Sequence, residues 1–110
     1  MDRFVKGDIV VLPFPFSDLS SAKKRPAIII ATLETEDIIL CPITSTKRND
    51  RYDVDINTNH FKEGNLKNAS SIRPNRLFTA DKKIILYKAG AIKMSKLKEV
   101  ENKIVEIITK

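Results

Sequence analysis

Two short stretches of the chain place cations beside groups that could hold a phosphate. Residues 23–26 read Lys-Lys-Arg-Pro, and residues 44–48 read Thr-Ser-Thr-Lys-Arg. The planar guanidinium of Arg25 can engage two phosphate oxygens at once, whereas a lysine acts as a point charge. The hydroxyl of Thr44 and those of its neighbours are donors suited to a phosphoryl group that gains charge in a transition state. Each stretch taken alone also fits a solvated charge run or an ordinary polar turn.

Other kinds of catalytic site have few candidate residues. Only three glycines are present, so we expect no glycine-rich phosphate loop. His60 is the one histidine, and we interpret it as a solvated loop residue. Cys41 is the one cysteine, and its apolar surroundings indicate a small buried hydrophobe. We therefore expect no metal site, no cofactor and no serine–histidine or paired-histidine mechanism.

The two stretches flank a predicted β-hairpin. Residues Arg25–Thr32 and Asp37–Ile43 are rich in β-branched side chains, and Glu34–Glu36 supplies the turn between them. In an antiparallel pair the start of one strand lies beside the end of the other. The pattern therefore predicts that Arg25 and Thr44 are neighbours at one end of the hairpin.

The remaining N-terminal half is predicted as one further strand and two loops. Val5–Leu12 contains a continuous apolar run, which is typical of a strand covered on both faces. Pro13 and a second proline remove backbone donors, so regular pairing is expected to end there. Polar loops are predicted over Phe16–Lys24 and Thr44–Arg51.

The second half is predicted to contain three more strands. Tyr52–Ile56 alternates between apolar and polar residues, which indicates a strand with one wet face. Asn57–Asn68 is interpreted as a long connection. Ser70–Thr79 and Lys83–Lys88 are predicted as strands, the first with an edge or a bulge at Pro74.

The C-terminus changes from the period of a strand to that of a helix. Leu97, Val100, Ile104 and Ile107 lie on one face of a helix, with Ser95 as the expected N-cap. Closely spaced strands leave no room for crossover helices between them. The chain is therefore predicted to be mainly β with one C-terminal helix packed on a small antiparallel sheet or barrel.

Length and composition limit the class of protein. The chain has 110 residues, which fits a single domain over 1–110, and 42% of them are hydrophobic. The net charge of +6 favours anionic partners. No secretory signal or membrane-spanning run is apparent, and the unpaired cysteine fits a reducing compartment, so we expect a cytoplasmic protein.

Six motifs, spread in order over nearly the whole chain, resemble those of MazF/PemK toxins from type II toxin–antitoxin systems. They are Gly7–Val10, Arg25–Ile30, Cys41–Ser45, Gly64–Leu66, Ser70–Arg73 and Lys88–Ile92. Each is weak alone, whereas the Arg-Pro strand and the Pro-x-Thr-Ser strand at this separation are specific. The resemblance implies an SH3-like small barrel shared with MazF, PemK and CcdB. It also implies a homodimer, a cognate antitoxin and cleavage of single-stranded RNA, usually mRNA, in a sequence-preferring way.

The resemblance assigns catalysis to Arg25 and Thr44, which match the family's catalytic Arg and Thr. We expect the RNA to be bound by further cationic, hydroxyl-bearing and aromatic side chains of the two loops and one later strand. They are Phe16, Ser17, Ser20, Ser21, Lys23, Lys24, Ser45, Lys47, Arg48 and Arg73. In the Pro-Phe-Pro-Phe stretch, Phe14 is expected in the core, and Phe16 is open to core, dimer or stacking roles.

The family's reaction uses the 2′-hydroxyl of the RNA as its nucleophile and needs no metal. It leaves a 2′,3′-cyclic phosphate and a 5′-hydroxyl, so activity should depend on RNA rather than DNA. A chain without a useful histidine or cysteine nucleophile can perform this reaction.

One departure from the family and two rival functions accompany this prediction. Some relatives place a Glu five residues before the Arg, where this chain has Ser20, so cleavage specificity is expected to differ. A CcdB-type gyrase poison is disfavoured, because that activity accompanies a Trp-Gly-Ile ending and this chain ends Ile-Ile-Thr-Lys. A decayed toxin that only binds partners is disfavoured by the presence of Arg25 and Thr44.

Overall fold

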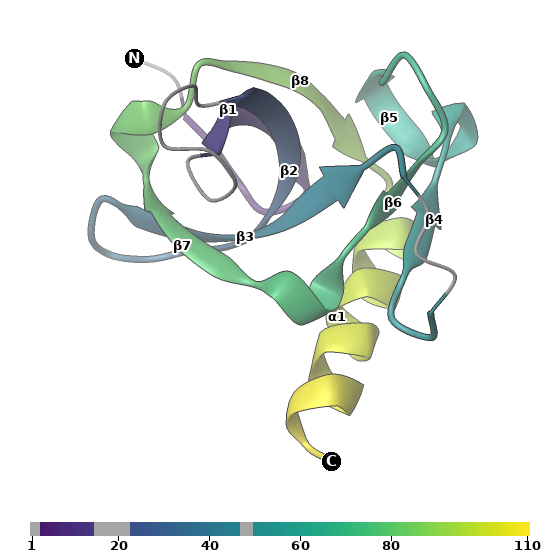
Figure 1. Cartoon of the computed structure of the whole chain (residues 1–110). Coiled ribbons are helices and arrows are strands. Elements are labelled where there is room, and N and C mark those ends of the chain that lie inside the picture. Colours follow the sequence, from purple (N-terminus) through teal and green to yellow (C-terminus); the bar gives the residue numbers. More distant parts are fainter. Residues whose placement is uncertain (1–2, 15–22, 47–49) are drawn as a thin grey trace.

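The computed structural model describes residues 3–14, 23–46 and 50–110, which form a curved antiparallel sheet with one C-terminal helix (Figure 1). The strands and helix are β1 (Asp8–Phe14), β2 (Lys23–Thr32), β3 (Asp37–Thr44), β4 (Val54–Ile56), β5 (Phe61–Gly64), β6 (Ser70–Ile72), β7 (Phe78–Asp81), β8 (Tyr87–Ile92) and α1 (Met94–Ile108). The strand order is β4-β6-β3-β2-β1-β8-β5, and β7 pairs with β3 outside this path. The predicted mainly β fold with one C-terminal helix is confirmed.

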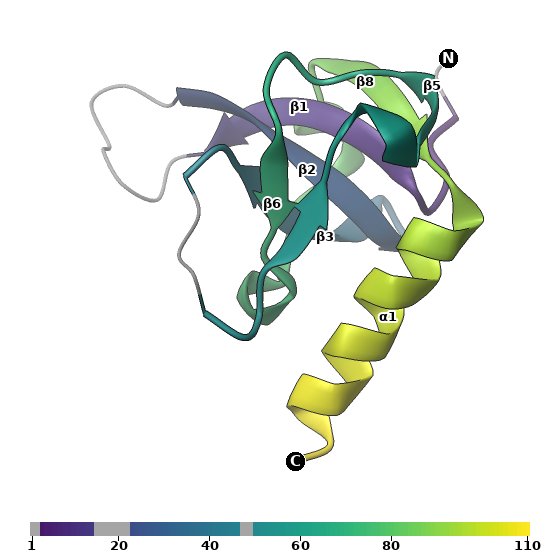
Figure 2. The same ribbon diagram turned by 90° about the vertical axis from the view of Figure 1, so that its right-hand side faces the viewer.

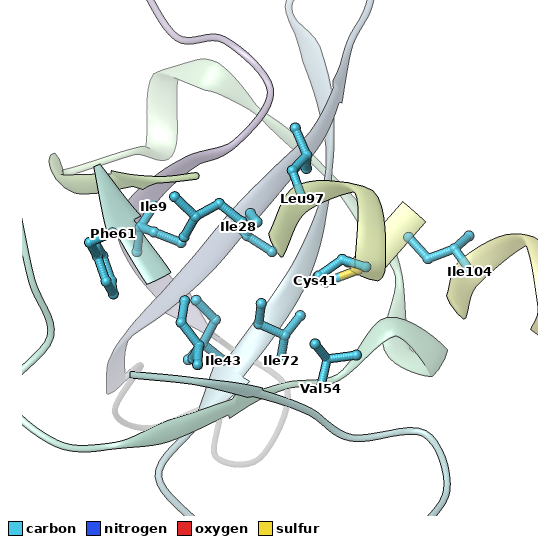
Figure 3. Packing of buried hydrophobic residues seen from close by; sticks show 12 residues of the cluster. Ile9, Ile28, Cys41, Ile43, Val54, Phe61, Ile72, Leu97 and Ile104 are labelled. Carbon is cyan, nitrogen blue, oxygen red and sulfur yellow. The ribbon is translucent and has the colours of Figure 1, made fainter. Parts of the chain in front are cut away.

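Two hydrophobic clusters cover opposite faces of β1, β2 and β3. The helix-side core lies between the sheet and α1 (Figure 3) and contains Ile9, Ile28, Cys41, Ile43, Val54, Ile56, Phe61, Ile72, Ile92, Leu97, Val100 and Ile104. The barrel-side core contains Val10, Leu12, Phe14, Ala27, Ile29, Ile38 and Leu40. Successive side chains of a strand point to opposite faces, so continuous apolar runs fill both clusters. The prediction that β1 is covered on both faces is confirmed.

Cys41 is the small buried hydrophobe that its sequence context predicts. Its side chain lies in the helix-side core and is 0% exposed. Burial raises the pKa of the Cys41 thiol to about 12. Because a thiolate is the reactive form, this thiol is chemically inert in the folded chain.

The boundaries of β1 and β2 differ from those predicted. Gly7 has a φ of +93° and the Asp8 carboxylate accepts a hydrogen bond from the Val5 N–H at 3.0 Å, so a turn precedes β1. Pairing continues past Pro13, which lies opposite Lys24, so Lys23 and Lys24 belong to β2 and not to the predicted loop Phe16–Lys24. The sheet tolerates this proline because β8 pairs with β1 only as far as Val11, which leaves the missing N–H on an open side.

The second half contains three corrections to the predicted elements. The stretch interpreted as a long connection contains β5. This strand pairs with β8 although only one of its four residues, Phe61, is buried. The predicted strand Ser70–Thr79 is divided into β6 and β7 by a 3-10 turn, Pro74–Arg76. The proline begins this turn because it has no N–H to donate to a ladder. The predicted strand Lys83–Lys88 overlaps β8 only at Tyr87 and Lys88, since Lys82–Ile84 forms a 3-10 turn.

The helix α1 buries the predicted face but begins earlier than expected. Leu97, Val100 and Ile104 are buried and Ile107 is half-buried, whereas the last turns extend away from the sheet in both views (Figures 1 and 2). The N-cap is Lys93, without a side-chain hydrogen bond, so the prediction of Ser95 as N-cap is wrong. None of the helices in residues 3–14, 23–46 and 50–110 is long and apolar enough to cross a membrane.

Gly64 and Gly90 let β5 approach β8 closely. They are partners in the ladder, and Gly64 has a φ of +71°. A Cβ at Gly64 would lie 2.2 Å from the carbonyl oxygen of Ala89, a backbone atom that cannot rotate away. Two of the family-like motifs therefore carry glycine for a steric reason.

Replacing Gly64 with alanine is expected to destabilise the fold. Overpacking against the backbone of β8 and the left-handed φ should together lower the free energy of unfolding by about 1–3 kcal/mol. Urea unfolding followed by circular dichroism measures this, with Lys62→Ala in the same strand as an exposed control. Equal stability of Gly64→Ala and the parent chain would contradict the steric account.

Candidate active site

The structure brings Arg25 and Thr44 together at one end of the β2–β3 hairpin. Ala27 pairs with Pro42, and continuing this antiparallel register by two residues places Arg25 opposite Thr44. Side chains at paired positions share a face of the sheet. Both residues are half-buried and line the same pocket, so the predicted neighbourhood is confirmed.

The pocket has a volume of about 570 Å³ and a mixed lining of cations, hydrogen-bonding groups and apolar side chains. It is built from the ends of β1, β2 and β3 and from the segment between β6 and β7. The lining residues are Phe14, Arg25, Pro42, Ile43, Thr44, Arg73, Asn75, Arg76, Leu77 and Phe78. Of the three arginines in this lining, Arg73 is paired with carboxylates, whereas the guanidiniums of Arg25 and Arg76 favour an anionic ligand over a neutral one.

The hydroxyl of Thr44 is oriented by the turn that follows β3. Its Oγ1 accepts a hydrogen bond from the Thr46 N–H at 3.1 Å. A hydroxyl that accepts one bond from its own backbone retains its hydrogen for donation to another group. Thr44 is thus a hydrogen-bond donor at the pocket wall.

Arg25 is available to a ligand. It is the third residue of β2 and lies opposite Leu12 of β1. Among residues 3–14, 23–46 and 50–110, no hydrogen bond or salt bridge engages its guanidinium. An arginine whose fork is unoccupied and half-buried beside a cavity can bind two oxygens of one phosphate.

Arg73 lines the same pocket in a different electrostatic setting. Its Nη1 donates to Asp50 Oδ2 at 3.1 Å and also to Asp53. Burial acts to lower the pKa of Arg73, but the bonds and charges of Asp53 and Asp50 outweigh it and raise the pKa. The predicted RNA-binding role of Arg73 stays a prediction, and two carboxylates already engage this cation.

Asp50 remains ionised at neutral pH within this group. Partial burial acts to raise the pKa of its carboxyl, but bonds from the Tyr52 N–H and from Arg73 outweigh it and lower the pKa. A carboxyl with a depressed pKa loses its contribution only as the pH falls through that low value. The ion pair is therefore intact at and above neutral pH.

Aromatic side chains form part of the pocket wall. The rings of Phe14 and Phe78 meet edge to face, with centroids 5.1 Å apart and planes at 67°. Phe14 is 8% exposed and belongs to the barrel-side core, so its predicted core position is confirmed. It also lines the pocket, which connects the core directly with the site.

The remaining predicted RNA-binding residues divide into two groups. Lys23, Lys24 and Ser45 are exposed on the strand ends beside Arg25 and Thr44, and they are not among the residues that line the pocket. The others lie outside the described residues, namely Phe16, Ser17, Ser20, Ser21, Lys47 and Arg48.

Sequence reasoning missed Asn75, Arg76 and Leu77 as pocket residues. All three are exposed and lie in or directly after the 3-10 turn that divides the predicted strand Ser70–Thr79. The signal was present, because Pro74 and Asn75 are turn formers next to two arginines. Interpreting the whole stretch as one strand hid the turn.

His60 is a capping residue instead of a solvated loop residue. Its Nδ1 accepts a hydrogen bond from the Asn57 N–H at 3.0 Å, and its backbone carbonyl accepts one from Lys93 at 2.8 Å. Partial burial, followed by the charge of Lys96, lowers the pKa of His60. The His60 ring is not among the side chains that line the pocket. Its role is to cap the 3-10 turn that precedes β5.

The fold and the pocket together define a small half-barrel β protein with a cationic cavity at one end of its central hairpin. The chain belongs to the family of PemK-like, MazF-like toxins of type II toxin–antitoxin systems, whose model matches residues 5–108. No curated protein matches the chain significantly in sequence.

Solved structures share this fold at low sequence identity. MazF from Deinococcus radiodurans superposes with a TM-score of 0.80 at 17% identity, covering 100% of both chains. Toxin MazF-mt6 from Mycobacterium tuberculosis has a TM-score of 0.74 at 16% identity, covering 93% of this chain and 96% of that one. An endoribonuclease in complex with its cognate antitoxin, from a mycobacterial species, has a TM-score of 0.78 at 11% identity, covering 97% and 96%.

Proposed function

We propose that the chain is a toxin endoribonuclease that cleaves single-stranded RNA without a metal. The observation that carries this proposal is the meeting of Arg25, which no described residue engages, and a donating hydroxyl, that of Thr44, on the wall of one pocket. Membership of the MazF-like family and the neighbours described as endoribonucleases support the same activity.

The proposed reaction is a transesterification within the RNA. The 2′-oxygen forms a bond to phosphorus and the bond from phosphorus to the 5′-oxygen breaks. The 2′-hydroxyl releases its proton to solvent, and the departing 5′-oxygen takes one up. The products are a 2′,3′-cyclic phosphate and a 5′-hydroxyl, in agreement with a lining that offers donors and cations.

Each proposed catalytic residue has one task. The Arg25 fork binds non-bridging oxygens of the phosphate and offsets the charge that develops when phosphorus is pentacoordinate. The Thr44 hydroxyl donates to one of these oxygens from a position set by the turn to Thr46. Arg25 acts as a cation and not as a base, because a guanidinium keeps its proton under physiological conditions.

The RNA strand is proposed to run across the ends of β2 and β3. Lys23, Lys24 and Ser45 are exposed there and can contact phosphates on either side of the cut. Arg76 and the ring of Phe78 lie on the pocket wall, where a cation and an aromatic edge can meet the nucleotide. Sequence preference in the cut is proposed to arise in this pocket.

The proposed partners are an antitoxin and a second copy of the chain in the cytoplasm. A neighbour solved with its cognate antitoxin and the MazE–MazF complex from Deinococcus radiodurans support an antitoxin partner. An antitoxin that covers the pocket would block the proposed RNA path. Light scattering of the purified chain, alone and with its antitoxin, measures both assemblies.

The test is incubation of the purified chain with RNA and with DNA of the same sequence in EDTA. We expect cuts in RNA alone, with ends that carry a cyclic phosphate and a 5′-hydroxyl when mapped by mass spectrometry. A gyrase supercoiling assay run in parallel should show no inhibition. Intact RNA together with inhibited gyrase would replace the proposed function with gyrase poisoning.

A further inference from the structure

Arg73 forms hydrogen bonds with residues on both sides of Thr44 in the chain. Its backbone N–H donates to the carbonyl oxygen of Pro42, two residues before Thr44, at 2.9 Å. Its guanidinium donates to Asp50 at 3.1 Å and to Asp53, both of which follow Thr44. One residue therefore bridges the strand that leads into the pocket wall and the chain that leads out of it.

This bridge is buried on the side of Arg73 and Asp53. The side chains of Arg73 and Asp53 are 10% and 9% exposed, and that of Asp50 is 36% exposed. Two carboxylates accept hydrogen bonds from one guanidinium nitrogen, so a phosphate would have to compete with both of them for Arg73. Asp50 also accepts the Tyr52 N–H at 3.0 Å, which orients its carboxylate toward Arg73.

We infer that Arg73 is a positioning residue that holds the Thr44 hydroxyl at the pocket wall, and not a ligand of the RNA phosphate. This inference rests on the proposed function, in which Thr44 donates to the phosphate. Thr44 pairs with Ser71 of β6. Arg73 follows Ser71 by two residues, so it also lies close to Thr44 in the register of the two strands.

The two roles make opposite predictions for a variant that frees Arg73. If Arg73 bound phosphate, removing a competing carboxylate would strengthen RNA binding and steepen its salt dependence. If Arg73 positions Thr44, the same change loosens the segment and slows the chemical step. Asp50 is the carboxylate to change because its partial exposure leaves the fold intact.

The experiment compares Asp50→Asn with Glu34→Gln as a charge-matched control at the far turn of the hairpin. Asparagine can still accept the Tyr52 N–H, so only the charge pair with Arg73 is removed. We expect Asp50→Asn to lower kcat about 10- to 100-fold, with KM and the salt dependence of binding unchanged. Glu34→Gln should match the parent chain. A lower KM or faster cleavage in Asp50→Asn would overturn the inference.

A double-mutant cycle with Thr44 identifies the residue through which Arg73 acts. Single-turnover cleavage by Arg73→Ala should be slower than that of the parent chain, and Arg73→Lys should recover part of the rate. In a Thr44→Ala background, adding Arg73→Ala should lower the single-turnover rate by less than about threefold, because the positioned hydroxyl is already absent. Additive losses would mean that Arg73 does not act through Thr44.

A measurement without RNA separates failure of this inference from failure of the proposed function. The methyl signal of Thr44 in a threonine-labelled sample should shift or broaden in Asp50→Asn and stay unchanged in Glu34→Gln. An unmoved signal in Asp50→Asn would overturn the positioning role even if the parent chain cuts RNA. Absence of cleavage by the parent chain, with the signal shifted, would overturn the proposed function alone.

Discussion

An RNA substrate with a single 2′-deoxynucleotide on the 5′ side of the cut bond is expected to remain intact under conditions that cut the all-RNA substrate to completion. The proposed nucleophile is the 2′-oxygen of that nucleotide, and the pocket lining supplies an arginine and a hydroxyl that stabilise charge. Removing the attacking atom leaves the protein nothing to activate, so this prediction has the largest expected effect.

Denaturing gel electrophoresis of end-labelled oligonucleotides measures this effect. The control carries the deoxynucleotide two positions away, where it leaves the nucleophile in place and should be cut at a rate near that of all-RNA. Cleavage at the modified position would show that water or a side chain attacks phosphorus. The roles proposed for Arg25 and Thr44 would then need revision.

Replacement of Arg25 or Thr44 by alanine should lower RNA cleavage about 100- to 1000-fold, the usual cost of losing one preorganised charge-stabilising group. Both side chains are half-buried at a strand end and outside the two cores, so the fold should persist. Single-turnover rates measure the loss, and circular dichroism verifies the fold.

Conservative variants distinguish the geometry of the groups from their presence. Arg25→Lys keeps the charge but loses the planar fork, so its rate should fall between those of the parent chain and Arg25→Ala. Thr44→Ser keeps the hydroxyl and should retain most activity. An alanine variant that cuts RNA at the parent rate would remove its residue from the mechanism.

Three arginines line one pocket, yet their surroundings suit them to different tasks. Within the part of the chain that the structure describes, no carboxylate pairs with Arg25, Arg76 lies exposed on a 3-10 turn, and Arg73 is paired with Asp50 and Asp53. Net charge alone would treat them as equivalent. The carboxylates around each guanidinium, and not its residue type, decide whether it can bind an anion.

The sequence-based prediction missed β5 because the pairing that makes it a strand is non-local. β5 has a single buried apolar residue and exists as a strand because β8 offers a free edge and Gly64 meets Gly90 there. No local hydrophobic periodicity predicts such a strand. The division of Ser70–Thr79 at Pro74 had a local signal, since proline cannot donate to a ladder and favours the first position of a helical turn.

The sequence by itself determined the meeting of Arg25 and Thr44, because a short turn and a two-residue side-chain period leave little freedom in the register of a hairpin. It also determined the burial of Cys41 and Phe14 and the apolar face of α1, which depend on local patterns. Only the tertiary structure decided what surrounds Arg73, since Asp50 and Asp53 lie 23 and 20 residues before it along the chain. Their approach depends on how β3, β6 and the turn at Pro74 pack together, and no spacing within the sequence encodes that contact.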